Sequence, residues 1–175
     1  DHPMPSGPVE QFLSLWHEAV ARKDLGVLAP RVADDVVLSS PALHRPKQGK
    51  AEVMALLGDV AASLEGYRVT RTWVDGPELL LEFEANGRLD LPAFGGAMEV
   101  GGRHGQQAKV GERSLQGVDR ITLDAEGRLQ HLKVFIRPYR GLVALMTAVV
   151  RRQVDRLAGP ARLIARLRLW LRGVG

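Results

Sequence analysis

The sequence contains no cysteine, which excludes disulfide bonds, thiolate metal sites, iron–sulfur clusters and cysteine nucleophiles. No apolar run approaches the roughly 18–20 residues needed to span a bilayer. Residues 1–8 also lack the apolar core of a signal peptide, so we expect a cytoplasmic protein. The chain has 175 residues, of which 45% are hydrophobic and 25% charged, as is typical of one folded domain with a buried core.

Positive charge is concentrated at the C-terminal end of the chain. Residues 137–175 hold nine arginines and one acidic residue, whereas residues 1–136 hold more acidic than basic residues. Because this acidic body would repel phosphate groups, we do not expect the protein to bind nucleic acid. Residues 161–172 place apolar side chains opposite arginines at helical spacing. This pattern is typical of peripheral membrane contact, and it equally fits a helix that packs on its own domain or on a second copy.

Hydrophobic periodicity predicts helices first and strands afterwards. Helices are expected over 9–20, 50–64 and 141–157, with a short helix capped by Asp24 after the first. Strands are expected over 36–40, 67–74, 78–89, 114–123 and 128–137. This order predicts an α+β fold in which a strongly curved mixed sheet wraps around the N-terminal helices and leaves a conical cavity.

A glycine-rich segment interrupts the predicted strands. Residues 92–111 include six glycines but lack the Gly-Lys-Ser/Thr ending of a phosphate-binding loop. The segment is therefore expected to be a long loop, either a disordered insertion or a lid over a ligand.

Asp119 is an acidic residue in an apolar series. Side chains alternate along a strand, and this alternation places Asp119 on the apolar face of its strand. If Leu123 pairs with Arg128 across the turn, Asp119 lies opposite Leu132, whereas a one-residue slip would put Lys133 there. Burial should raise the pKa of this carboxyl, so that it could give or take a proton. In the alternative interpretation it caps a backbone N–H or pairs with an arginine.

Short strings along the chain indicate a family. They are FLSLW at 12–16, KDL at 23–25, VADDV at 32–36, GVDR at 117–120, DAEGRL at 124–129 and VFIRP at 134–138. In this order and spacing they resemble the SnoaL-like and ketosteroid-isomerase-like group of the nuclear transport factor 2 superfamily, over roughly residues 8–150. The resemblance implies a cystatin-like α+β barrel with a hydrophobic pocket, and frequently a homodimer through the outer face of the sheet. Residues 1–7 would then be a disordered N-terminus or an artificial remnant, and 151–175 a basic helical extension.

The catalytic residues of the group match this sequence only in part. Ketosteroid isomerases have an Asp base just before the proline that ends the first strand, where this chain has Ser40. Their helix-one tyrosine corresponds to Trp16, and their second oxyanion donor, an Asp, corresponds to Asp119. Limonene-type epoxide hydrolases have a further Asp where this chain has Val134. The acid/base Asp of SnoaL-like polyketide cyclases resembles Asp119, so the resemblance implies cyclase chemistry rather than 3-ketosteroid isomerisation.

We predict two catalytic residues, Asp119 and His44. His44 follows the first strand, near the expected pocket mouth, and the alternative is an exposed loop histidine. The expected ligand-binding walls are Phe12, Trp16, Leu38, Ser40, Leu81, Phe83, Leu132 and Val134. No histidine pair has metal-ligand spacing, so we expect neither a metal nor a cofactor. The predicted function is a cofactor-independent acid/base enzyme, a cyclase or isomerase, that acts on an apolar oxygenated small molecule. The alternative is a non-catalytic ligand-binding or dimerisation module of the same fold.

Overall fold

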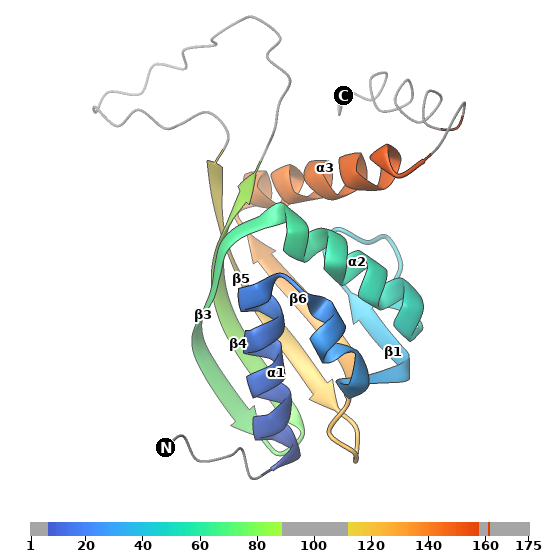
Figure 1. The fold of residues 1–175 in the computed structure, drawn as a ribbon. Helices are drawn as coiled ribbons and strands as arrows, with labels where there is room; N and C mark the ends of the chain where they lie inside the picture. The colour runs from blue at the N-terminus through green and yellow to red at the C-terminus, as the bar shows by residue number, and fades with distance from the viewer. Residues whose placement is uncertain (1–6, 89–111, 158–160, 162–175) are drawn as a thin grey trace, which may run out of the picture.

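A single curved sheet of six strands carries the helices on its concave side (Figure 1). The computed structural model describes residues 7–88, 112–157 and 161. Its helices are α1 (Pro8–Arg22), the 3-10 helix η1 (Leu25–Arg31), α2 (Lys50–Ser63) and α3 (Tyr139–Asp155). Its strands are β1 (Val32–Ser39), β2 (Lys47–Gln48), β3 (Leu64–Asp75), β4 (Glu78–Arg88), β5 (Glu112–Leu123) and β6 (Leu129–Arg137). The α+β fold class is thus confirmed, with a curved sheet that does not close.

The strand order is β2-β1-β6-β5-β4-β3. Strands β3 to β6 form an antiparallel meander, and β1 joins its far side in parallel with β6. The glycine-rich segment 92–111 and, apart from residue 161, the predicted helix over 161–172 lie outside the described residues. Among the described residues, no helix has both the length and the apolar character needed to cross a membrane.

The predicted register between β5 and β6 is wrong by two residues. Asp119 pairs with Val134 rather than with Leu132. The cause lies at the turn, where Leu123 pairs with Leu129 and an irregularity in β6 follows. Because side-chain direction repeats every two residues, the shift leaves Asp119 on the concave, apolar face as predicted.

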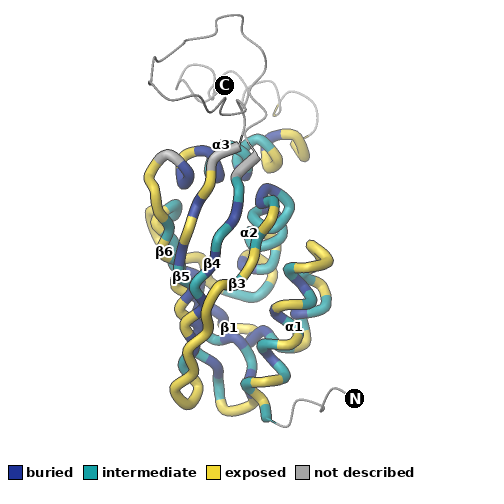
Figure 2. The backbone as a smooth tube through the Cα atoms, turned by 90° about the vertical axis from the view of Figure 1, so that its left-hand side faces the viewer, coloured by how far each residue is buried: buried dark blue, intermediate teal, exposed yellow. Residues whose placement is uncertain are grey.

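The core lies between the concave face of the sheet and the helices, whereas β3 runs along an edge that is largely exposed (Figure 2). Helix α1 buries Phe12, Trp16 and Ala19, which share one face because they are spaced by four and three residues. Helix α3 contributes Leu145 and Val149 to a second cluster at the other end of the sheet. The helices therefore cover two parts of one concave surface.

The convex face of the sheet carries exposed aromatic and aliphatic side chains. Trp73 pairs with Leu80 across β3 and β4, and Phe135 lies on β6. The Arg71 guanidinium lies over the Trp73 ring and the Lys133 amino group over the Phe135 ring, so cations partly cover the two aromatic faces. A homodimer through this face stays a prediction.

Gly117 is required where two strands and an aromatic ring meet. It lies on the concave face of β5, two residues before Asp119. A Cβ atom at this position would lie 2.4 Å from the Phe83 ring and 2.4 Å from the backbone oxygen of Phe135. To make room for a methyl group, the Phe83 side chain on β4 would have to move, and so would the backbone of β6 at Phe135.

We therefore expect Gly117→Ala to lower the free energy of unfolding by about 1–3 kcal/mol, the range for overpacking a filled core. Gly58→Ala in α2 is the matched control, because a methyl group added there would meet no neighbouring atom within 4 Å. That substitution should raise stability by roughly 0.5–1 kcal/mol through helix propensity. Urea denaturation of both variants measures the difference, and equal stability of the two would refute the packing argument.

Candidate active site

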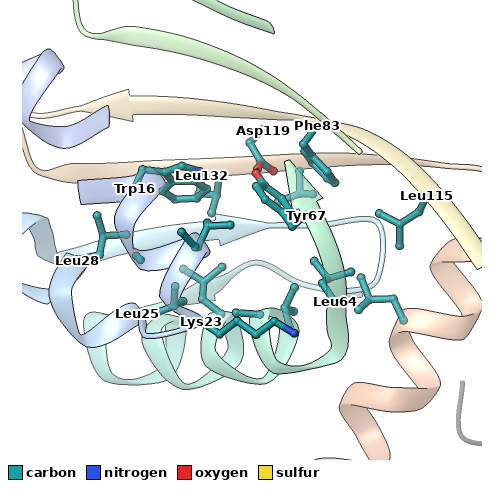
Figure 3. A pocket seen from close by; sticks show the side chains of 18 of the residues that line it. Trp16, Lys23, Leu25, Leu28, Leu64, Tyr67, Phe83, Leu115, Asp119 and Leu132 are labelled. Atoms are coloured by element: carbon teal, nitrogen blue, oxygen red, sulfur yellow. The ribbon is translucent and has the colours of Figure 1, made fainter. Parts of the chain in front are cut away.

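A cavity of about 270 Å³ lies between the concave face of the sheet and the helices α1, η1 and α2 (Figure 3). Its described walls are apolar except at four side chains, which are those of Trp16, Lys23, Tyr67 and Asp119. The volume is close to the lower limit of ordinary ligand pockets, about 300 Å³. The cavity is therefore suited to a small, mainly apolar molecule.

Asp119 is the only acidic residue among the described walls of this cavity. Its side chain comes from β5 and is 5% exposed. Burial raises the pKa of its carboxyl from the ordinary 3.8 to about 7, because the charged form loses its hydration. Among the described residues neither an arginine nor a backbone N–H bonds to it, so the partners expected for a structural role are missing there.

Tyr67 is the hydrogen-bond partner of Asp119. Its hydroxyl donates to the Asp119 carboxylate, with 3.1 Å between Oη and Oδ2, and this bond opposes the rise in the carboxyl's pKa. Burial and the nearby Asp119 charge both raise the pKa of Tyr67, so its hydroxyl stays protonated. The Tyr67 ring stacks on Phe83, with 5.0 Å between ring centroids, which fixes the direction of the hydroxyl.

The indole N–H of Trp16 is buried and has no hydrogen-bond acceptor among the described residues. It lies near the Tyr67 hydroxyl and partly offsets the rise in that group's pKa, but it does not reach hydrogen-bond geometry. An unpaired buried donor costs about 1–3 kcal/mol. An oxygen of a bound ligand could accept this N–H, which would relieve that cost.

The structure gathers five of the predicted site residues around the cavity. They are Asp119, Trp16, Phe83, Leu132 and Val134. Phe12 and Leu81 are fully buried in the adjoining core and do not line it. Tyr67 was not predicted, although it begins the predicted strand 67–74. Tyr67 and Val69 alternate with the exposed Arg68 and Thr70, so the period of two along this strand was the signal that could have placed Tyr67 on the concave face.

Leu38 and Ser40 line a different cavity, of about 480 Å³, between α2, α3 and the end of β1. The Ser40 hydroxyl accepts a hydrogen bond from the backbone N–H of Ala42 at 3.2 Å. His44 is exposed in the loop between β1 and β2 and lines neither cavity. The structure therefore does not bring His44 or Ser40 to Asp119. Within the described ranges, no group of three or more His, Asp or Glu side chains could hold a metal.

The raised pKa of Asp119 makes a prediction for stability. Between pH 4 and 7 the folded protein retains a proton that the unfolded chain has lost, so its stability falls as pH rises through that window. Asp119→Asn removes this penalty and keeps an acceptor for Tyr67. The free energy of unfolding of the variant minus that of the wild type should therefore be larger at pH 8 than at pH 5, by roughly 2–3 kcal/mol. Urea denaturation at both pH values measures this gain.

The control for that experiment is Asp35→Asn, because Asp35 is an exposed acid on β1. Its stability relative to the wild type should be the same at pH 5 and pH 8. A constant difference for Asp119→Asn as well would show that Asp119 titrates normally.

The bond from Tyr67 stabilises the ionised form of Asp119. We expect Tyr67→Phe to raise the pKa of Asp119 further above its wild-type value of about 7, because burial then acts unopposed. Carbon-13 NMR of the labelled carboxyl follows this titration directly. An unchanged or lower pKa in the variant would mean that the hydroxyl does not bond to the carboxylate in solution.

Comparison with known proteins places this geometry in a family. The model of the SnoaL-like domain matches residues 13–132. The structure is similar to a steroid delta-isomerase from Pseudomonas aeruginosa, with 30% identity, a TM-score of 0.69 and coverage of 91% of this chain and 100% of that chain. A protein with a cystatin-like fold from Silicibacter pomeroyi has 27% identity and a TM-score of 0.64, and covers 87% of this chain and 89% of that chain.

A candidate SnoaL-like polyketide cyclase from Shewanella putrefaciens shares the fold alone, with 15% identity, a TM-score of 0.54 and coverage of 80% and 84%. No curated protein sequence matches the chain. The family match covers most of the described domain, including the larger part of α1 and all of the strand that carries Asp119. The chain belongs to the SnoaL-like domain family, with the fold of the nuclear transport factor 2 and ketosteroid-isomerase group.

Proposed function

We propose that this protein is a cofactor-independent acid/base enzyme that moves a proton on a small apolar molecule with a carbonyl oxygen. The observation that carries the proposal is a buried carboxyl with a pKa of about 7 inside an apolar cavity. At neutral pH both of its protonation states are populated, so Asp119 can take a proton and return it. A solvated aspartate would be a much weaker base at the same pH.

The arrangement of donors suggests how the reaction would run. Ionised Asp119, oriented by the Tyr67 hydroxyl, removes a proton from the carbon next to the substrate carbonyl. The electron pair moves to the carbonyl oxygen, which accepts a hydrogen bond from the unpaired Trp16 N–H. Where the substrate has a carbon–carbon double bond next to that carbon, protonated Asp119 returns its proton to the far carbon of the resulting dienolate, which yields an isomer. Where it has a second carbonyl, the enolate carbon attacks that carbonyl carbon and closes a ring, and Asp119 returns its proton to the alkoxide oxygen that forms. Both outcomes conserve atoms and need no oxidant or reductant.

Relatives support the class of chemistry but not its details. The neighbour from Pseudomonas aeruginosa is a steroid delta-isomerase, and the one from Shewanella putrefaciens is a candidate polyketide cyclase. In this chain Ser40 stands where the resemblance implies the isomerase base, and it lines the other cavity. Asp119 would therefore act as the sole carboxyl for both removal and return of the proton.

A second candidate function is binding without catalysis. It is favoured by the lack of another carboxylate or histidine among the described residues that line the cavity. In that case the Tyr67 hydroxyl and the Trp16 N–H would bind an oxygen of the ligand, and Asp119 would transfer no proton. The two functions differ in whether Asp119 changes a reaction rate, which one experiment can measure.

The experiment is proton exchange in deuterated water at the carbons beside the carbonyl of 2-decalone, an apolar bicyclic ketone, followed by NMR. The wild type should accelerate exchange, with a rate that rises through a pKa of about 7 as Asp119 ionises. Asp119→Asn should lower the enzymatic rate by about 100-fold or more, the usual contribution of a general base. Asp35→Asn should leave it unchanged.

Tyr67→Phe tests in the same assay whether the exchange rate follows the ionisation of Asp119. The midpoint of its rate profile should move to higher pH, because the bond that favours ionised Asp119 is lost. If the ketone binds but wild type and Asp119→Asn exchange protons equally fast, the enzyme proposal is refuted and the binding function stands.

A further inference from the structure

We infer that the natural ligand carries a carboxylate that binds the Lys23 amino group at the mouth of the Asp119 cavity. This inference rests on the proposed function, since it assumes that the cavity holds a small apolar molecule. The inference says that this molecule has a second polar group, at the end opposite its carbonyl oxygen. The inner end would be an oxygen that meets Trp16 and Asp119, and the outer end an anion that meets Lys23.

The exposure of the wall residues shows which end of the cavity is the mouth. Leu28 and Phe83, like Asp119, are buried, whereas Lys23 and Gly66 are exposed. The opening thus lies at the end of α1 and the beginning of β3. In Figure 3 the Lys23 side chain extends along this side of the cavity, and its amino group points toward Leu64. A ligand with its body inside would place its outer end beside this amino group.

Lys23 is the only basic residue among the described walls of the cavity. Its side chain makes no ion pair or hydrogen bond with another described residue. The neighbouring acid, Asp24, is engaged elsewhere, because its Oδ1 accepts from the backbone N–H of Gly26 at 2.8 Å and begins η1. The Lys23 ammonium is therefore available to an external anion.

The backbone at Lys23 is unusual for a lysine. The residue ends α1 in the left-handed region, with φ of 52° and ψ of 30°, and its N–H bonds to the Val20 oxygen at 3.1 Å. Glycine is the favoured residue for this helix ending, and a residue with a Cβ is strained in it. The sequence thus has an unfavourable residue where glycine would suit the backbone, and that residue places a cation at the cavity mouth.

A basic hollow adjoins the mouth and shares Lys23 with the cavity. Its charged lining residues are Lys23, Arg151, Arg152 and Arg156, with Glu65 and Asp155. Because Arg156 is paired with the buried Asp59, the four cations face three anions in all, and the small excess of positive charge attracts an anionic ligand to this side of the molecule. Arg152 donates to the Ala62 oxygen at 2.8 Å and Arg156 pairs with Asp59, so these two hold α3 against α2. Lys23 is then the group placed to contact the ligand itself.

A matched pair of probes tests the inference. 7-Oxooctanoate has a ketone near one end and a carboxylate at the other, and methyl 7-oxooctanoate has a methyl ester in place of the charged carboxylate. Calorimetry at pH 8 and low salt should show that the wild type binds the acid about fivefold more tightly than the ester, near the upper limit for an exposed ion pair. This preference should shrink in 0.5 M salt because the pair is exposed and therefore screened.

Lys23→Gly should abolish the preference for the acid and leave the affinity for the ester unchanged. Glycine suits the left-handed backbone, so the variant should unfold at an equal or higher temperature, and a loss of binding could not be attributed to misfolding. Lys133→Met removes the same charge from the convex face and should retain the preference.

The outcomes distinguish this inference from the proposed function. Binding of both probes with equal affinity, or a preference that survives in Lys23→Gly, overturns the role of Lys23 and leaves the cavity function standing. Failure of the wild type to bind either probe also overturns the inference, and the proton exchange of 2-decalone then decides separately whether the proposed function stands.

Discussion

The burial of the Asp119 carboxyl in an apolar cavity, with a single tyrosine as its described partner, governs the properties of the site. Desolvation raises the carboxyl's pKa and the Tyr67 bond lowers it, and desolvation has the larger effect. The resulting shift, from 3.8 to about 7, corresponds to roughly 4 kcal/mol of stability lost at neutral pH relative to acid. A cationic partner beside Asp119 would lower the pKa of its carboxyl and recover that stability, but the carboxyl would then not be protonated at neutral pH and could not return a proton.

The neighbouring strands keep this arrangement in place through two close contacts of the Phe83 ring. Gly117 has no side chain, so the Phe83 ring can lie against β5 two residues before Asp119. Phe83 in turn stacks on Tyr67 and directs its hydroxyl to the carboxylate. The position of the Tyr67 hydroxyl on β3 thus depends on the lack of a side chain at Gly117 on β5, two strands away. This explains why a glycine stands in the middle of a strand, where it is otherwise unfavourable.

Local patterns in the sequence predict part of this structure and miss what depends on distant strands. The alternation around Asp119 gives its face correctly even though the register is wrong by two residues, because faces repeat with that period. The same alternation puts Tyr67 on the face of Val69, but its bond to Asp119 joins β3 to β5, which are not neighbours in the sheet, and no local pattern predicts that contact. Ser40 was predicted as the last residue of the first strand and lies directly after β1, and the packing of α2 and α3 makes it part of the wall of a separate cavity. Such assignments depend on packing between helices, which no local pattern encodes.

The separation of the two cavities bears on the chemistry. Both are lined by Leu57, Val60, Val134, Ile136 and Leu145, so these apolar side chains stand between Ser40 and Asp119. A two-carboxylate mechanism needs both groups on one substrate, and here an acid at position 40 would face the other cavity. A single group must then accept the proton and return it, which works best when its pKa is close to the ambient pH. The burial of Asp119 provides that pKa, and the unpaired Trp16 N–H provides the complementary donor for the substrate oxygen.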